Sequence, residues 1–219
     1  MTEAAIKRAK KQKINRIIII ASAIILVLLI VLWIVQFNIT NSKAIPQLVE
    51  YYEPGDFVEV GDNFYIDGFE MMDGYSYRVN GAKSVKFDEY LKLIGHEELL
   101  ENRSKETIPE KIILLDITLK NSGNTDGNVF VLKYSLYSGS LCMSADFQLW
   151  SMIDERFTGN AYIKLLENSE ADMIIPFIPM EINTVTMGDE VNRRINEEDF
   201  YFCICEFPVR KMIRVEIEK

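Results

Sequence analysis

The hydrophobic pattern of the chain begins with one uninterrupted apolar run. From Ile17 to Phe37 there are 21 residues, of which sixteen are Ile, Leu, Val or Phe and none is charged. A helix rises about 1.5 Å per residue, so the run would be roughly 31 Å long, close to the ~30 Å thickness of a hydrocarbon core. The pattern predicts a transmembrane helix over residues 17–37.

Two other interpretations of this run are weaker. A cleaved signal peptide has an apolar region of about 7–15 residues that precedes a small-residue cleavage site. Here the only Ala-x-Ala triplet, from Ala21 to Ala23, lies near the start of the run. A helix buried in a soluble core is the other alternative, and the length of the run and its lack of charge disfavour it. We therefore expect an uncleaved anchor.

The flanks of the run predict its orientation. Lys43 is the only basic residue in the forty positions after the run. Basic residues precede it at six positions: Lys7, Arg8, Lys10, Lys11, Lys13 and Arg16. Because basic flanks stay inside, residues 1–16 are predicted to be a cytoplasmic tail. We expect a juxtamembrane linker over residues 38–50, where Pro46 discourages helix continuation, and an extracytoplasmic domain over residues 51–219.

Beyond the anchor, the pattern changes to short runs in which apolar residues occupy every second position. In residues 111–121 the even alternation from Ile113 to Leu119 is typical of a half-buried strand. A Gly- and Asn-containing loop over residues 122–128 then leads to a second run over residues 129–138, which predicts a hairpin or a sheet-to-sheet connection. Further apolar runs cover 56–60, 63–69, 75–82, 141–150, 171–179, 200–207 and 211–218. About nine short strands predict a mainly β fold, a β-sandwich.

One segment has the spacing of a helix. Apolar residues recur at helical intervals at Phe87, Tyr90, Leu91 and Ile94, and Gly95 is a suitable C-cap. The sequence therefore predicts one short helix within the β domain.

Charge limits the possible partners of the domain. The chain has 24 basic and 33 acidic residues, of which 6 and 1 lie in the tail, so the remainder carries 18 − 32 = −14. A strongly acidic surface repels phosphate groups, and we therefore expect no nucleic-acid partner.

Candidate catalytic chemistry is sparse. The single histidine, His96, follows the predicted helix beside Glu97 and Glu98, a pattern typical of a solvated surface residue. The chain contains none of the common nucleophile, zinc or phosphate-binding motifs. No catalytic residue and no cofactor-binding residue is predicted.

The cysteines allow three interpretations. On a regular strand Cys203 and Cys205 would point to the same face, within a run that is apolar on both faces. We expect them to pack as small core residues of a central strand. The alternatives are a disulfide between Cys142 and one of them, and a metal site, which would need a fourth ligand.

An acidic segment between two predicted strands offers oxygen ligands at Asp62, Asn63, Asp67, Glu70 and Asp73. Calcium takes six to eight oxygens, and extracellular turns commonly supply them. The spacing does not match an EF-hand, so a solvated hairpin is the alternative.

Several runs resemble known modules. Residues 51–93, "YYEPGDFVEVGDNFYIDGFEMMDGYSYRVNGAKSVKFDEYLKL", resemble the opening of a family of uncharacterised single-pass extracytoplasmic proteins of Gram-positive bacteria, a domain of unknown function. The later runs "ILLDITLKNSGNT", "KLLENSEADMIIPF" and "PVRKMIRVEI" are similar to telokin-like, immunoglobulin-like β-sandwich modules of lipoproteins. The resemblance implies a fold and a compartment but no reaction, and this chain differs from the lipoproteins in having a spanning helix.

These observations predict a membrane-anchored extracytoplasmic binding or accessory module of the cell envelope that performs no catalysis. It would associate with the membrane through residues 17–37 and with another envelope or membrane protein, or with an exported peptide. The alternative is a calcium-dependent sensor or an envelope enzyme that uses the acidic face.

Overall fold

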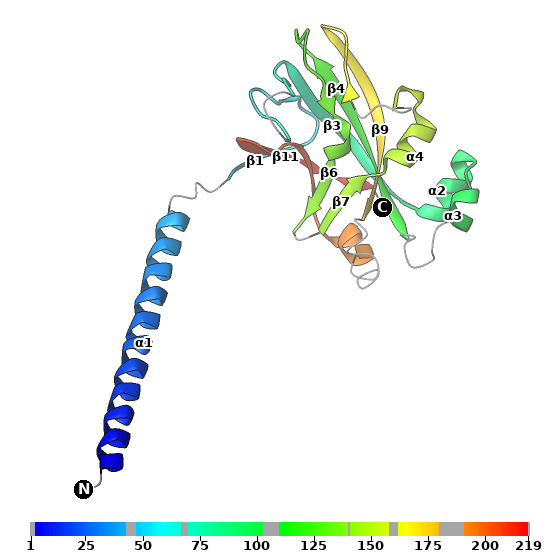
Figure 1. Cartoon of the computed structure of the whole chain (residues 1–219). Helices are drawn as coiled ribbons and strands as arrows, with labels where there is room; N and C mark the ends of the chain where they lie inside the picture. The colour runs from blue at the N-terminus through cyan, green and yellow to red at the C-terminus, as the bar shows by residue number, and fades with distance from the viewer. Residues whose placement is uncertain are drawn as a thin grey trace. The chain divides into compact units, whose positions relative to one another are not determined.

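The structure is a computed structural model. It describes seven segments of the chain: residues 3–42, 47–66, 70–102, 110–139, 141–157, 162–179 and 191–218. The chain divides into two compact units, Met1–Pro46 and Gln47–Lys219, and each is described by itself. Figure 1 labels the main elements of both units.

The first unit is a single long helix, α1, over Glu3–Ser42. Its most apolar part, Ile18–Thr40, has a mean hydropathy of 3.4, and the side chains there are exposed. In the described part of the chain it is the one helix long and apolar enough to cross a membrane. Length and composition thus define it as a candidate anchor, in agreement with the predicted span.

The second unit is mainly β, as predicted. Its strands are β1 (Leu48–Tyr52), β2 (Val58–Glu59), β3 (Tyr75–Lys86), β4 (Lys111–Asn121), β5 (Val129–Phe130), β6 (Ser135–Ser138), β7 (Leu141–Ala145), β8 (Tyr162–Ile163), β9 (Ser169–Pro179), β10 (Phe200–Cys205), β11 (Val209–Val215) and β12 (Ile217–Glu218). Its labelled helices are α2 (Phe87–Ile94), α3 (Glu98–Asn102), α4 (Phe147–Ile153) and the 3-10 turns η1 (Val131–Lys133) and η2 (Glu155–Phe157). Residues 191–197 are also helical.

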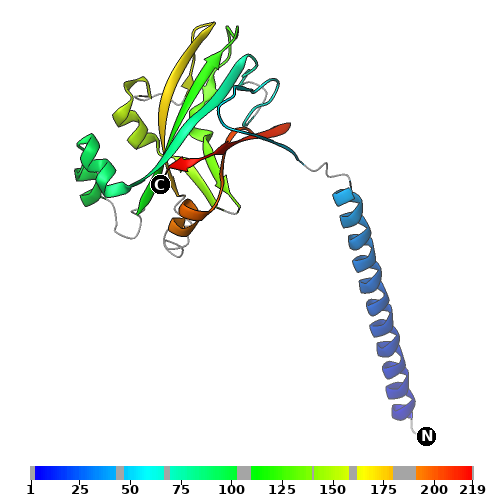
Figure 2. The same ribbon diagram turned by 180° about the vertical axis from the view of Figure 1, so that it is seen from behind.

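Most strands belong to one mixed sheet rather than to two separate sheets. Ten strands are connected in the order β1-β11-β10-β6-β7-β9-β4-β3-β12, with β2 paired to β3. The pairs β1·β11 and β3·β12 are parallel, and the other pairs of this sheet are antiparallel. Figures 1 and 2 show that the sheet curls strongly, so that strands from its two halves face each other.

The strand β4 shows why the alternating pattern was informative. Its bounds match the predicted run, and Ile113, Leu115, Ile117 and Leu119 are fully buried in the main core. The prediction of a hairpin between this strand and residues 129–138 is wrong, because β4 pairs with β3 and β9. Those residues instead form β5, η1 and β6, and β5 lies in a separate two-stranded sheet with β8.

Aromatic side chains fill the space inside the curl. The ring of Phe202 on β10 contacts Tyr77 on β3, Tyr134 before β6 and Phe177 on β9, with centroid distances of 5.8, 5.3 and 6.2 Å. The hydroxyls of Tyr77 and Tyr134 lie 2.8 Å apart and hydrogen bond to each other. Because a buried hydroxyl is costly only without a partner, this pair is compatible with the core. Phe202 thus connects strands from both halves of the sheet.

The helices cover part of the outer face, which we define as the face of β3, β4 and β9 opposite the main core. The predicted helix is confirmed as α2, and Gly95 ends it in a left-handed conformation with φ of 76°. Residues 141–150, predicted as one strand, form β7 and then α4. Asp146 causes the change, because its carboxylate caps α4 by accepting a hydrogen bond from the Leu149 N–H at 3.0 Å.

The predicted linker over residues 38–50 is longer than the structure allows. The helix α1 extends to Ser42, and β1 begins at Leu48 and pairs in parallel with β11. The sequence suggested no strand here because β1 obtains its partner from residues about 160 positions away.

This strand gives a prediction about truncation. A chain that starts at Gln47 should unfold cooperatively, whereas one that starts at Glu53 lacks β1 and exposes the edge of β11. Loss of the half-buried Val49 and Tyr52 should lower the free energy of unfolding by roughly 2–4 kcal/mol. Thermal melts followed by circular dichroism would measure a decrease of roughly 4–16 °C. Equal melting temperatures would show that β1 does not stabilise the domain.

Candidate functional site

The acidic segment proposed as a calcium site uses part of its polar groups to hold its own loop. The Asn63 side-chain amide donates to the Val60 carbonyl at 2.6 Å and its oxygen accepts from the Val209 N–H at 2.9 Å. The Glu70 carboxylate accepts from two backbone N–H groups, those of Tyr65 and Ile66, both at 2.8 Å.

The other candidate ligands do not complete a site in the described part of the chain. Asp62 and Asp73 are exposed, and Asp67 lies outside the described residues. Among the described residues, no three Asp, Glu, His or Cys side chains come together as metal ligands would. Asn63 and Glu70 therefore have structural roles.

His96 lies between α2 and α3, where its Nδ1 is 2.8 Å from a carboxylate oxygen of Glu98. This hydrogen bond with His96 lowers the pKa of Glu98. The pair lies at the surface, and its geometry is that of a local polar contact between neighbours in sequence.

The cysteines are free thiols, and the strand β10 that carries two of them is central in the sheet, between β6 and β11. The expectation that Cys203 and Cys205 share a face is wrong. Cys203 is opposite Met212 while Cys205 is opposite Lys211, because the register shifts between them. Consecutive residues of β11 point to opposite sides, so this β-bulge turns the two thiols to opposite sides as well.

Burial determines the chemistry of these thiols. Desolvation raises the pKa of all three, that of Cys205 to about 11, and Cys203 and Cys205 are fully buried. A thiol acts as a nucleophile only as its thiolate, so these groups are poor nucleophiles at neutral pH. They pack as small core residues, as expected.

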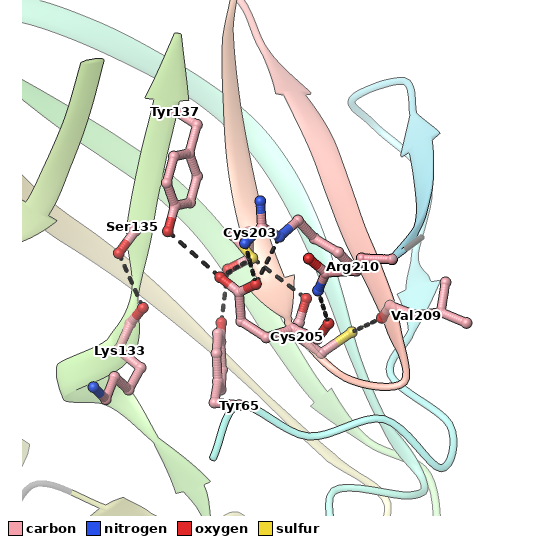
Figure 3. Close-up of polar contacts among 10 residues, drawn as sticks. Tyr65, Lys133, Ser135, Tyr137, Cys203, Cys205, Val209 and Arg210 are labelled. Carbon is pink, nitrogen blue, oxygen red and sulfur yellow. Dashed lines mark hydrogen bonds and ion pairs between the residues drawn. The ribbon is translucent and has the colours of Figure 1, made fainter. Parts of the chain in front are cut away.

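A polar cluster surrounds Cys203 and closes the turn from β10 to β11. The Glu206 carboxylate forms an ion pair with Arg210 at 2.5 Å and accepts from the Tyr137 hydroxyl at 3.4 Å. The Tyr65 hydroxyl donates to the Cys203 carbonyl at 2.6 Å. Figure 3 shows Tyr137, Cys203 and Arg210 grouped around these contacts. Because its members are largely paired with one another, this cluster stabilises the turn.

The outer face carries a groove that the sequence did not predict. A first hollow of about 540 Å³ lies between α2, the end of α4 and the strands β4 and β9. A second hollow of about 320 Å³ lies over β3, β4, β9 and β12. Both are lined by Leu114, Asp116 and Ile174, so they form one continuous depression, which we call the outer groove.

Polar contacts hold the floor of the outer groove in place. Asn80 donates to the Asp116 carboxylate at 3.0 Å, and the Thr118 hydroxyl donates to Asp172 at 2.7 Å. The wall is held by Arg156, which forms an ion pair with Asp154 at 2.5 Å. Arg156 also donates to the Asp172 carbonyl at 2.8 Å. Among the described residues, the carboxylates of Asp116 and Asp172 accept hydrogen bonds but have no ion-pair partner.

Apolar side chains are exposed in the same groove. Leu93 is 83% exposed and Ile174 is 51% exposed. Both departed from the local pattern: Leu93 lies outside the apolar stripe of α2, and Ile174 lies beside the buried Met173 in an alternating strand. These departures were the available signal, but only the fold brings the two residues to one depression.

The fold and the groove define a class of protein: a mainly β domain that follows a candidate membrane anchor and presents a groove on one sheet face. The chain belongs to the family defined by DUF5028, a domain of unknown function, which matches residues 49–211. Comparison with curated proteins and with solved structures found no match.

Proposed function

We propose that this protein is a membrane-anchored binding or accessory module of a Gram-positive cell envelope, with no catalytic activity of its own. The helix α1 would stay uncleaved, with residues 1–16 in the cytoplasm and the β domain outside. The charge difference across α1 supports this orientation. The curled β domain would be related to the telokin-like, immunoglobulin-like modules that its strand ends resemble.

The observation that carries this proposal is the outer groove. Its exposed Leu93 and Ile174 contribute little to the domain's own core, and exposed apolar side chains grouped in a depression are typical of binding sites. The hydrogen-bonded floor makes the groove rigid, which lowers the entropic cost of binding. In contrast, burial raises the pKa of the three thiols and keeps them protonated, so they are poor nucleophiles at neutral pH.

The anchor gives the groove its location. Confinement to a thin layer at the membrane raises the effective concentration of the domain toward a membrane-bound partner without any new contact. The partner would be another envelope or membrane protein, or an exported peptide in transit.

Site-specific photo-crosslinking in intact cells tests this function. A photoreactive residue at Leu93 of the full-length protein should form one discrete adduct with a polypeptide. The same residue at Leu166, which is 82% exposed but does not line the outer groove, is the matched control. The adduct from position 93 should disappear when Gly81→Leu fills the groove. Equal adducts from both positions, or none from either, would contradict a binding role for the groove.

A further inference from the structure

We propose that the outer groove binds an extended polypeptide segment that presents apolar and basic side chains on one side. This inference rests on the proposed binding function and specifies its ligand. It follows from the distribution of apolar and acidic groups along the groove.

One end of the groove is rich in apolar side chains, and charged residues also line it. The first hollow is lined by Leu93 and Ile94 of α2, Ile153 of α4 and Ile174 of β9. A leucine or isoleucine of the ligand placed there would cover the exposed surface of Leu93 and Ile174 and remove it from water. The hydrophobic effect makes such burial favourable in proportion to the area covered.

The other end of the groove is acidic. The second hollow is lined by Asp116 and Glu218, and it joins a third hollow of about 290 Å³ through Asn80, Gly81 and Glu218. The third hollow adds Glu216, which lies 3.9 Å from Arg214.

The charges along the whole groove do not balance. The three hollows are lined by five acidic residues, Asp116, Asp154, Asp172, Glu216 and Glu218, and two basic residues, Lys83 and Arg156. Asp154 pairs with Arg156, and Glu216 lies beside Arg214, which leaves three acidic residues and one basic residue. The acidic excess therefore falls on Asp116, Asp172 and Glu218, with Lys83 as the remaining basic residue. A ligand that carries positive charge would therefore be attracted to the groove. Phosphate-bearing ligands, such as lipid headgroups and nucleic acids, would be repelled.

The shape of the groove favours an extended chain. The joined hollows run from α2 across β9, β4 and β3 to β12, which is a path rather than a round pocket. In an extended peptide every second side chain points the same way, so leucine and lysine at alternate positions would both face the floor. Gly81 leaves the floor open, because a Cβ added there would have no neighbour within 4 Å.

The test uses the full-length protein in nanodiscs of uncharged phosphatidylcholine, with empty nanodiscs as the blank. The probe is a fluorescein-labelled peptide of about eight residues, roughly 26 Å when extended, in which serine alternates with leucine or lysine. Two control peptides replace every lysine by glutamate or every leucine by serine. Fluorescence anisotropy should show saturable binding of the leucine-lysine peptide and none of either control.

Variants locate the binding. The double variant Asp116→Asn with Asp172→Asn should weaken binding roughly two- to tenfold at low salt and less at high salt. The reason is that salt screens the attraction between these two carboxylates and the lysines of the peptide. Leu93→Ser and Gly81→Leu should each abolish saturable binding while leaving the thermal melt unchanged, since Leu93 is exposed and Gly81 has free space. Two matched controls alter exposed residues that do not line the groove. The double variant Asp126→Asn with Glu167→Gln is the control for the double Asp variant, and Leu166→Ser is the control for Leu93→Ser. Both controls should bind the peptide as the natural chain does.

The possible outcomes test the ligand class and the binding function separately. Unchanged affinity in the double Asp variant, or equal binding of the glutamate peptide, would overturn the inference about basic ligands. Failure of the leucine-lysine peptide to bind, together with a persistent groove-specific crosslink at position 93, would overturn the ligand class and leave the binding function standing. Absence of both would overturn both proposals.

Discussion

Replacing Phe202 by alanine is expected to lower the free energy of unfolding by about 3–5 kcal/mol. Phe202 is fully buried, and its ring contacts rings of β3 and β9 as well as Tyr134. Removal of the ring leaves a cavity where the two halves of the curled sheet meet, and the surrounding strands cannot collapse into it without changing register. Thermal melts of the domain should show a decrease of roughly 6–20 °C.

The matched control is Tyr51→Ala, which also deletes an aromatic side chain but at a position that is 64% exposed. Tyr51 makes one edge contact with Tyr201, so this variant should lose less than about 1 kcal/mol. A loss of similar size in both variants would mean that the aromatic cluster inside the curl is not the main stabilising contact.

The second large effect is expected at alkaline pH. Burial raises the pKa of Cys203 and Cys205, whereas thiols of an unfolded chain have a pKa of about 8.5. Above that pH the unfolded state releases thiol protons that the folded state retains, so stability is complete below pH 8.5 and decreases as pH rises. Each thiol contributes about 1.4 kcal/mol per pH unit, which amounts to about 5 kcal/mol for both by roughly pH 10.5.

Urea unfolding under reducing conditions, followed by fluorescence of the buried Trp150, would measure this decrease. The variant with Cys203→Ala and Cys205→Ala should be less stable at neutral pH, because small cavities form, but its stability should change much less up to about pH 10. Cys142→Ala, at a less buried thiol, is the control and should retain most of the dependence. An equally steep decrease in the double variant would assign the effect to other groups, such as the buried Tyr65 and Tyr77 hydroxyls, whose pKa values burial also raises.

Elements defined by local periodicity could be predicted from the sequence. The apolar run of α1 is continuous, β4 alternates from Ile113 to Leu119, and α2 combines a helical stripe with a glycine at its end. In each case the pattern of neighbouring residues already defines the type of element, so no distant partner is needed to recognise it.

Elements that depend on distant partners were missed or wrong. The strand β1 depends on β11 far away in the sequence, and the bulge in β10 depends on the opposing residues of β11. The helix α4 was obscured because its apolar residues continue those of β7, and only the cap at Asp146 separates them. The strand β1 and the bulge in β10 arise when backbone groups pair across the sheet, which local alternation does not report.

The sequence by itself determined that the chain has an apolar helix of membrane-spanning length, a mainly β domain after it, and a strongly acidic surface, because each depends on composition or on neighbouring residues. The tertiary structure decided which way each cysteine points and where a ligand could dock. The outer groove combines α2, β3, β4, the end of α4, β9 and β12, and its acidic and apolar residues become neighbours only when the curled sheet brings those segments together.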